Sequence, residues 1–321
     1  MRESGRNGAA YEHAPVLAGA VADGLRIRPD GVYADGTLGG GGHAALICGK
    51  LSAGGLLLGI DKDRDAIEAA GKTLSGYVCG RILRQGDFGD IKEILRENGV
   101  AAIDGALLDL GVSSYQLDNP ERGFSYRNDA PLDMRMDARD EKALTAEQVV
   151  NTYDAGALTR VFREYGEERW ASRIAAFIIR AREKEPVRTT GALTDIIKAA
   201  IPASARRTGP HPAKRCFQAL RIEVNGELRI LERAVGDFVD VLSPGGRLAV
   251  ITFHSLEDRI VKDVFRGRET PCECPPDLPV CVCGKTPDAR RVNRRPIIAD
   301  ETELAENHRA RSAKLRIIEK L

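Results

Sequence analysis

The chain has 321 residues, of which 48 are basic and 47 acidic, and the net charge of +1 excludes binding of a polyanion through the overall field of the protein. The N-terminal residues lack an apolar signal sequence and no stretch of roughly 18 apolar residues occurs, which excludes a membrane protein and predicts a soluble, cytoplasmic one. At about 100 to 200 residues per domain, the length predicts two domains or one domain with a large insertion.

The first elements in chain order predict a nucleotide-binding unit. A helix is indicated by three apolar residues spaced by four, Leu17, Val21 and Leu25. An apolar run at residues 32–34 then ends at Asp35 and passes through four glycines, 39–42, into a second helix. Because glycine has no Cβ, a ligand can approach the backbone of such a loop. Strand, loop and helix follow one another as in the first unit of a Rossmann fold, although the glycines alone are equally typical of a flexible surface loop.

The next two strands add candidate ligand-binding side chains. The apolar run at residues 55–60 ends at Asp61, about 20 residues after the glycines, where a carboxylate can accept hydrogen bonds from both ribose hydroxyls. This layout is shared by NAD enzymes and S-adenosylmethionine enzymes. The third strand, residues 81–85, leads to Asp87 and Phe88, an acid and an aromatic ring that suit an adenine. The alternative is a helix N-cap at Asp87 and a core position for Phe88.

A fourth strand at residues 103–109 completes the pattern. Helical segments separate the strands, so the sequence predicts the α/β class, with a doubly wound, mostly parallel sheet that binds its ligands at the carboxyl ends of the strands. An acid stands at each of the four predicted ends: Asp35, Asp61, Asp87 and Asp109. We therefore expect a ligand site at this edge of the sheet.

The strand pattern is interrupted from residue 113 to residue 207. A turn-rich loop extends to residue 137, and helices are predicted at 146–153, 155–165, 168–184 and 190–200. They indicate an all-α domain, residues 113–207, inserted between two parts of the sheet domain, 1–112 and 208–321. The third helix carries a basic stripe, which is either solvated or in contact with RNA: Arg169, Arg173, Arg180 and Lys184.

The chain then returns to the sheet through a basic helical segment. Four of its residues are predicted to form the local patch that RNA binding requires, Lys214, Arg215, Arg221 and Asn225. A fifth strand at residues 247–253 leads to His254, which is either a satisfied loop histidine or a substrate contact. The alternating run at residues 313–319 predicts a closing strand with one solvent-exposed face.

Four of the seven cysteines lie close together in a loop at residues 271–284. The odd total argues against a disulfide framework. Cys272, Cys274, Cys281 and Cys283 form two C-x-C pairs that could hold a tetrahedral zinc ion, but zinc sites usually have C-x-x-C spacing. We therefore favour a loop of reduced thiols and predict no metal.

Several long motifs occur in a specific order: DGTLGGGGH at residues 35–43, LLDLGVSS at 107–114, QLD at 116–118, ERGFS at 121–125, PLDMRMD at 131–137, YGEER at 165–169, FQALRI at 217–222 and FHSLEDR at 253–259. With them the chain closely resembles the bacterial small-subunit rRNA methyltransferase H family, also called MraW. The resemblance implies a class I methyltransferase fold with an inserted helical domain, and transfer of a methyl group from S-adenosylmethionine to N4 of a cytidine in the decoding region of 16S rRNA.

The resemblance also implies site residues. Carried over by position, the cofactor contacts are Gly41, Gly42, His43, Asp61, Phe88, Asp109 and Gln116, of which Gln116 has no signal in the strand pattern. Asp109, or a backbone carbonyl of residues 110–112, is the candidate proton acceptor. The substrate would be 16S rRNA, within the small ribosomal subunit or free, and a homodimer is possible. The rival functions are an NAD dehydrogenase and a non-catalytic, RNA-binding ribosome assembly factor.

Overall fold

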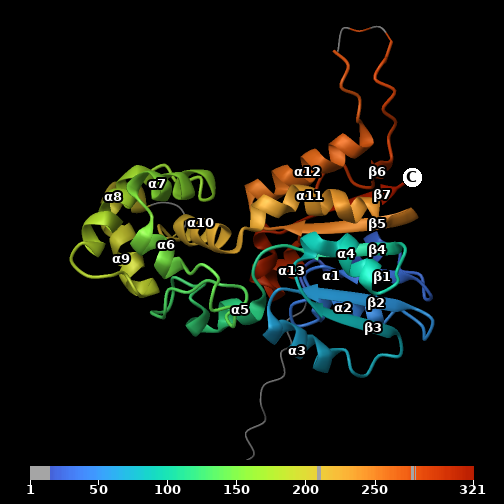
Figure 1. Ribbon diagram of the computed structural model, residues 1–321, viewed down its shortest axis with the longest axis horizontal. Helices are drawn as coiled ribbons and strands as arrows, with labels where there is room; N and C mark the ends of the chain where they lie inside the picture. Colours follow the sequence, from blue (N-terminus) through green and yellow to red (C-terminus); the bar gives the residue numbers. More distant parts are fainter. Residues whose placement is uncertain (1–14, 208–210, 276–277, 279) are drawn as a thin grey trace, which may run out of the picture.

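The computed structural model describes residues 15–207, 211–275, 278 and 280–321. Parts of the predicted basic segment (208–210) and of the cysteine loop (276–277 and 279) thus lie outside the described residues. Figure 1 shows a sheet domain on the right, a helical lobe on the left and an extension that projects from the sheet domain. Among the described residues, no helix has the length and apolar composition needed to cross a membrane.

The sheet confirms the predicted fold class. Its seven strands lie in the order β3-β2-β1-β4-β5-β7-β6, and only β7 runs antiparallel to its neighbours. The strand order reverses between β1 and β4, which is where sheets of this kind bind ligands. The strands are β1 (Val32–Asp35), β2 (Leu56–Asp61), β3 (Gly80–Gln85), β4 (Ile103–Asp109), β5 (Leu242–Thr252), β6 (Ala289–Arg291) and β7 (Lys314–Lys320).

Both faces of the sheet are covered by helices. Leu57 and Leu58 are adjacent and point to opposite faces, and both are fully buried. Leu57 belongs to a cluster with α1 (Ala18–Leu25), α2 (Gly42–Cys48) and α3 (Arg64–Thr73). Leu58 belongs to a cluster with α4 (Ile91–Glu97), α11 (Glu227–Asp240) and α12 (Ser255–Glu269). The helix-covered parallel strands therefore hold their carboxyl ends at one rigid edge.

The helical lobe has a separate core, formed by α6 (Ala146–Thr152), α7 (Ala155–Glu164), α8 (Ala171–Arg182), α9 (Thr190–Ala200) and α10 (Lys214–Asn225). The preceding loop, predicted without helices, contains the short α5 (Ser114–Asp118). Helix α10 contributes Cys216, Phe217 and Leu220 to the core of this lobe. The predicted boundary at residue 207 thus separates α10 from the helices with which it packs, and we propose a boundary near Gly226 instead.

The solvent-exposed face predicted for β7 is wrong. Arg316 and Glu319 lie three positions apart, so they point to opposite faces of the sheet, and both are buried. Arg316 Nε donates to Asp258 Oδ1 at 2.7 Å, and Glu319 Oε2 accepts from Arg247 Nε at 2.8 Å. Helix α12 covers one of these pairs, and the charged residues are tolerated because each has a partner. The remaining helix, α13 (Glu301–Glu306), was not predicted.

Candidate active site

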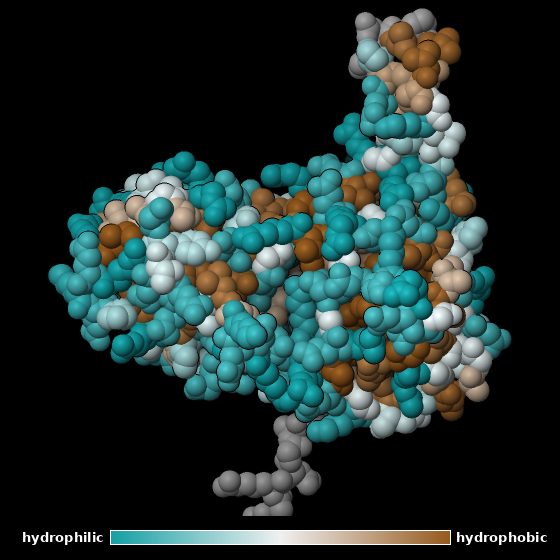
Figure 2. All heavy atoms as spheres, viewed as in Figure 1, coloured by the Kyte–Doolittle hydropathy of each residue, from teal (hydrophilic) through white to brown (hydrophobic). Residues whose placement is uncertain are grey.

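A large cleft lies where the carboxyl ends of the strands face the helical lobe, and Figure 2 shows the surface hollowed between the two lobes. Its volume is about 1110 Å³. The sheet domain contributes Gly42, His43, Asp61, Phe88 and Asp109, all predicted cofactor residues, and the opposite wall includes Phe124, Tyr126 and Phe217. This volume lies slightly above the range of ~300 to 1,000 Å³ that is usual for small-molecule pockets.

The glycine loop forms one wall of the cleft. Gly41 has φ of 85°, in the left-handed region, and a Cβ there would lie 3.3 Å from Ala70. A side chain at this position would therefore be strained. Gly41 itself does not line the cleft, whereas Gly40 does, and a Cβ on Gly40 would meet open space. The loop thus turns at Gly41 so that the backbone of its neighbours borders the ligand space.

Asp61 is fixed at the end of β2. Its two carboxylate oxygens accept from the backbone amides of Gly39, at 2.7 Å, and Asp63, at 2.8 Å. Burial raises the pKa of Asp61 to about 6, and these two amides oppose the rise. The carboxylate borders the cleft with unused lone pairs, since each oxygen can accept more than one hydrogen bond. This geometry fits the predicted acceptor for ribose hydroxyls.

Asp109 and His43 form the polar floor of the cleft. Asp109 N donates to Thr37 Oγ1 at 2.6 Å, and His43 Nε2 lies 3.5 Å from Asp109 Oδ2. Burial by itself would lower the pKa of His43, but the carboxylates of Asp109 and Asp35 outweigh it and the pKa is raised. Asp109 Oδ1 and both ring nitrogens of His43 are buried without a hydrogen-bond partner. Buried polar atoms of this kind normally have partners, so the arrangement fits a polar ligand.

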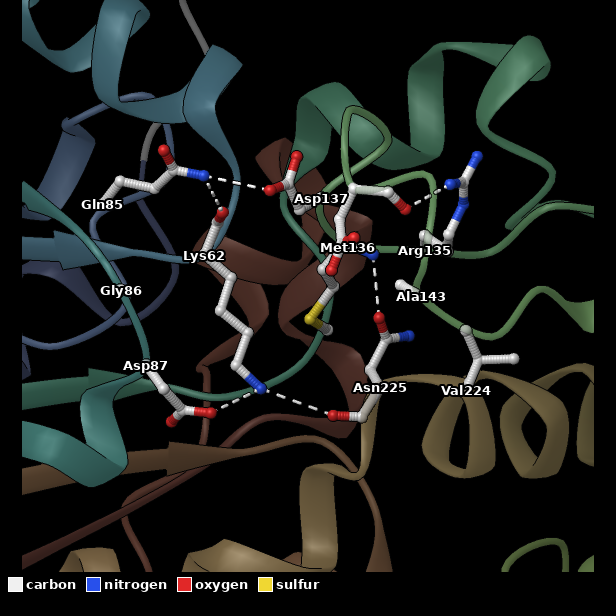
Figure 3. Close-up of a pocket in the computed structure, with 11 residues that line it drawn as sticks. Lys62, Gln85, Gly86, Asp87, Arg135, Met136, Asp137, Ala143, Val224 and Asn225 are labelled. Carbon is white, nitrogen blue, oxygen red and sulfur yellow. Dashed lines mark hydrogen bonds and ion pairs between the residues drawn. The ribbon is translucent and has the colours of Figure 1, made fainter.

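The other two strand-end acids do not line this cleft. Asp35 is fully buried, its Oδ1 accepts from Thr37 N at 3.1 Å, and burial raises its pKa to about 6. Asp87 caps the short 3-10 helix that begins at Phe88, accepting from Gly89 N at 2.8 Å, which confirms the N-cap part of the alternative, whereas Phe88 is only partly buried and lines the cleft. Its other oxygen lies 2.7 Å from Lys62 Nζ in a side pocket of about 390 Å³ (Figure 3).

Gln116 lines the cleft and is almost fully buried. Its side chain accepts from Ser113 N at 3.0 Å and donates to Asp63 Oδ2 at 3.0 Å. Asp63 also pairs with Arg122 Nη1 at 2.9 Å, and Arg122 Nη2 donates to the carbonyl of Met136 at 2.7 Å. This buried network ties residues 113–136 to the sheet. Sequence reasoning missed Asp63 and Arg122 as positioning residues, because their pairing spans 59 positions and has no local signal.

The four predicted RNA contacts on α10 differ in their surroundings. Lys214 and Arg215 are exposed, Lys214 borders the cleft, and Arg215 Nη1 donates to the carbonyl of Glu167 at 3.2 Å. Arg221 is held by Glu227, with Nε 2.8 Å from Oε1. Figure 3 shows Asn225, whose Oδ1 accepts from Met136 N at 2.8 Å. RNA contact by Arg221 or Asn225 stays a prediction. To make it, each side chain would have to bind RNA in addition to its partner in the protein, or give that partner up.

His254 also lines the cleft, at the start of α12. It is the N-cap of this helix, and its Nε2 lies 2.9 Å from Glu257 Oε1. Burial would raise the pKa of Glu257, but His254 and Arg221 outweigh it and the pKa is lowered. His254 is thus the capping residue of α12 at the wall of the cleft, its Nε2 is buried without a hydrogen-bond partner, and a substrate contact stays a prediction.

The site has clear relatives among known proteins. The sequence profile of the MraW methylase family matches residues 10–321. The "Ribosomal RNA small subunit methyltransferase H" of Symbiobacterium thermophilum is 55% identical over 312 residues, which cover 97% of this chain and 98% of that protein. The protein of the same name from Acetivibrio thermocellus is 55% identical over 313 residues, 97% and 99% of the two chains. A "putative rRNA-methylase" structure from Clostridium thermocellum covers 96% of this chain, with 11% identity and a TM-score of 0.44.

The sheet, the helical lobe and the cleft between them fall inside the matched residues. The chain therefore belongs to the MraW methylase family.

Proposed function

We propose that this rRNA methyltransferase transfers a methyl group to N4 of a cytidine in the decoding region of 16S rRNA. The cofactor is S-adenosylmethionine. The observation that carries the proposal is the cleft, which joins the cofactor loops to an unpartnered Asp109 carboxylate oxygen and leaves further space toward the helical lobe. An unpaired or flipped base needs such space beside the cofactor. The names of the relatives support the RNA of the small ribosomal subunit as the substrate, free or assembled, and hence the cytoplasm as the compartment.

The proposed reaction is a direct in-line displacement. S-adenosylmethionine supplies an electrophilic methyl carbon on a positively charged sulfur. The N4 nitrogen forms a bond to this carbon while the carbon–sulfur bond breaks, and the electron pair of that bond goes to the sulfur. The nitrogen then loses a proton. Because the N4 lone pair is delocalised into the ring, a hydrogen-bond acceptor that favours a pyramidal nitrogen would assist the attack. Asp109 is the proposed acceptor, and the protein accelerates the reaction mainly by positioning.

Calorimetry separates this function from its rivals. Both cofactors contain ribose, so Asp61 alone does not distinguish them and a binding measurement is needed. S-adenosylmethionine should bind to the purified protein and NAD should not. Binding of NAD but not of S-adenosylmethionine would identify a dehydrogenase. Binding of neither, with intact RNA binding, would identify an assembly factor with a degenerate cofactor site.

Asp61 gives a prediction for cofactor affinity. Asp61→Ala leaves two ribose hydroxyls without their charged acceptor, and binding of S-adenosylmethionine should weaken by about 1.5 to 3 kcal/mol, or roughly 10- to 150-fold. Because the raised pKa of this carboxyl is about 6, the wild-type affinity should also fall as the pH drops through that value and the group becomes protonated. Calorimetry at about three pH values per pH unit between pH 5 and pH 8 measures both the affinity loss in Asp61→Ala and the pH dependence of the wild type.

The matched variant is Asp61→Asn, which keeps one acceptor oxygen but cannot titrate. Its affinity should lie between those of the wild type and Asp61→Ala and should not depend on pH in this range. A pH dependence that persists in Asp61→Asn would instead indicate Asp35 or His43, whose pKa values are also raised. Unchanged affinity in Asp61→Ala would limit Asp61 to stabilising the glycine loop.

The basic residues at the start of α10 give a prediction for RNA binding. Lys214 and Arg215 are exposed, and Lys214 has no ion-pair partner within the described part of the chain. Replacing both with alanine should weaken RNA binding and reduce the slope of log K against log salt by roughly 1.5, as expected for two lost phosphate contacts. Binding of S-adenosylmethionine should not change. Filter binding at several salt concentrations measures the slope.

Arg26 and Lys50 serve as the control pair for this variant. Both are exposed, and they follow α1 and α2 at the end of each helix that lies away from the cleft. Their replacement by alanine removes the same charge and should leave the salt slope unchanged. If the two double variants behave alike, the RNA lies elsewhere, and the basic stripe of α8 becomes the next candidate.

A further inference from the structure

The extension between α12 and β6 ends in four cysteine side chains that lie close together. It projects from the sheet domain on the upper right of Figure 1. Its base is held by two ion pairs: Arg268 Nη1 lies 2.7 Å from Asp288 Oδ2, and Arg291 Nε lies 2.6 Å from Glu269 Oε2. The cysteines lie beyond this base, outside the active-site cleft, and have no role in the proposed reaction.

The sulfur atoms have the spacing of a tetrahedral metal site. Four of the Sγ–Sγ distances are 3.4 Å (Cys281 to Cys283), 3.5 Å (Cys272 to Cys281), 3.8 Å (Cys272 to Cys283) and 3.9 Å (Cys274 to Cys281), and all four atoms lie within 4.8 Å of one another. Four sulfurs at the usual Zn–S distance of about 2.3 Å would be roughly 3.8 Å apart. In a disulfide the two sulfurs would be only about 2.05 Å apart, and all four cysteines are free.

The backbone around the cysteines supports this arrangement. Leu278 N donates to the carbonyl of Pro275 at 3.0 Å, so the chain turns back between the two C-x-C pairs and brings them side by side. Val282 N also donates to Cys274 Sγ at 3.4 Å. Amide hydrogen bonds of this kind stabilise thiolate ligands and orient them toward a metal.

Packing gives no other reason for the four thiols to meet. Cys272 and Cys281 are exposed, and the neighbouring Val280 and Val282 are 70% and 77% exposed, so the described residues of the tip form no hydrophobic core (Figure 2). Thiols are weak hydrogen-bond donors, and contacts among them at the surface stabilise a loop very little. A metal ion would supply the stabilisation that the apolar residues do not.

We propose that Cys272, Cys274, Cys281 and Cys283 together bind one zinc ion, which orders the tip of the extension. Zinc is favoured because a closed set of four cysteine thiolates is typical of structural zinc sites. The C-x-C spacing argued against a metal in the sequence, but the turn at Pro275 lets two such pairs supply two ligands each. The exposed valines would then be held at the tip as a fixed apolar surface.

Metal analysis of the full-length protein tests the proposal. The protein is purified under reducing conditions without chelator, and elemental analysis should find one zinc ion per chain. X-ray absorption should show four sulfur ligands at about 2.3 Å. Cys272→Ser/Cys281→Ser, which removes one ligand from each pair, should reduce zinc to below about a tenth of an equivalent, as expected when half of the ligands are lost. Val282→Ser is the control, because it introduces a serine between Cys281 and Cys283 without removing a ligand. It should keep one full equivalent of zinc.

Two further readouts keep the test independent of catalysis and of metal loss during purification. Cobalt added to the chelated wild type should give thiolate charge-transfer absorption, and the double variant should not. Tryptic cleavage after the exposed Lys285 should accelerate by about tenfold or more once zinc is removed, because the tip then unfolds locally. Cofactor affinity should not change in any variant. Zinc-free protein that fails to bind cobalt, disulfides among the four cysteines, or iron in place of zinc would overturn the proposal.

Discussion

Asp109→Asn should lower kcat by about 100-fold or more at saturating substrates, with little change in the affinity for S-adenosylmethionine. The substitution keeps the size of the side chain and one acceptor oxygen but removes the charge. Asp109 Oδ1 is buried without a partner in the cleft, so the carboxylate is available to accept from the attacking amine. Single-turnover methylation of rRNA with excess enzyme measures the chemical step, and calorimetry measures cofactor binding.

The cofactor role implied by the family resemblance predicts a different pattern for this variant. If Asp109 mainly holds S-adenosylmethionine, the apparent KM for the cofactor should rise and kcat should survive. Asp87→Asn is the matched control, because Asp87 also stands at a strand end but caps a 3-10 helix, pairs with Lys62 and does not itself line the cleft. It should keep its kcat. Full activity of Asp109→Asn would exclude a catalytic carboxylate and leave the carbonyls of residues 110–112 as acceptors.

Arg122→Ala should lower the free energy of unfolding by about 3 to 5 kcal/mol, the usual cost of leaving one member of a buried ion pair without its partner. Both side chains of the Arg122–Asp63 pair are buried, and Arg122 also donates to the carbonyls of Arg135 and Met136. Loss of these bonds should release residues 113–136 from the sheet. Urea denaturation measures the stability, and calorimetry should show weaker cofactor binding as well, because Gln116 shares Asp63 with Arg122.

Arg96→Ala is the control for the loss of an arginine. Arg96 pairs with Glu93 on the exposed side of α4, and its removal should have no measurable effect on stability or binding. Arg122→Lys separates charge from geometry, since the single ammonium nitrogen of a lysine keeps the charge but lacks the planar fork of the guanidinium. It should recover only part of the loss. Wild-type stability of Arg122→Ala would show that the network contributes little and that packing alone holds the loop.

The strand ends of the sheet domain were predictable because hydrophobic runs and terminal acids are local signals. Asp61 and Asp109 meet in the cleft, as the topology of a parallel sheet requires. The same rule could not distinguish Asp35 and Asp87, which end strands in the same way. Asp35 is fully buried and Asp87 caps a 3-10 helix, and both outcomes depend on side-chain geometry that the strand pattern does not contain.

Interactions between distant segments account for most of what was missed. The amphipathic pattern of α10 indicates a helix but not its neighbours, so its packing in the helical lobe was not predicted. Arg316 and Glu319 are charged residues of the last strand, for which a solvent-exposed face was predicted, yet both find buried partners from other elements. In each case the local sequence defines the element, and tertiary contacts decide its surroundings.

The most direct measurement uses small ribosomal subunits from a strain that lacks this protein. The subunits are incubated with the purified protein and S-adenosylmethionine carrying a labelled methyl group, and the 16S rRNA is analysed by nucleoside mass spectrometry. N4-methylated cytidine should appear in the decoding region, at one site per subunit, and Asp109→Asn should form it about 100-fold more slowly. Label on another base or another atom, or no label on rRNA despite bound cofactor, would contradict the proposed function.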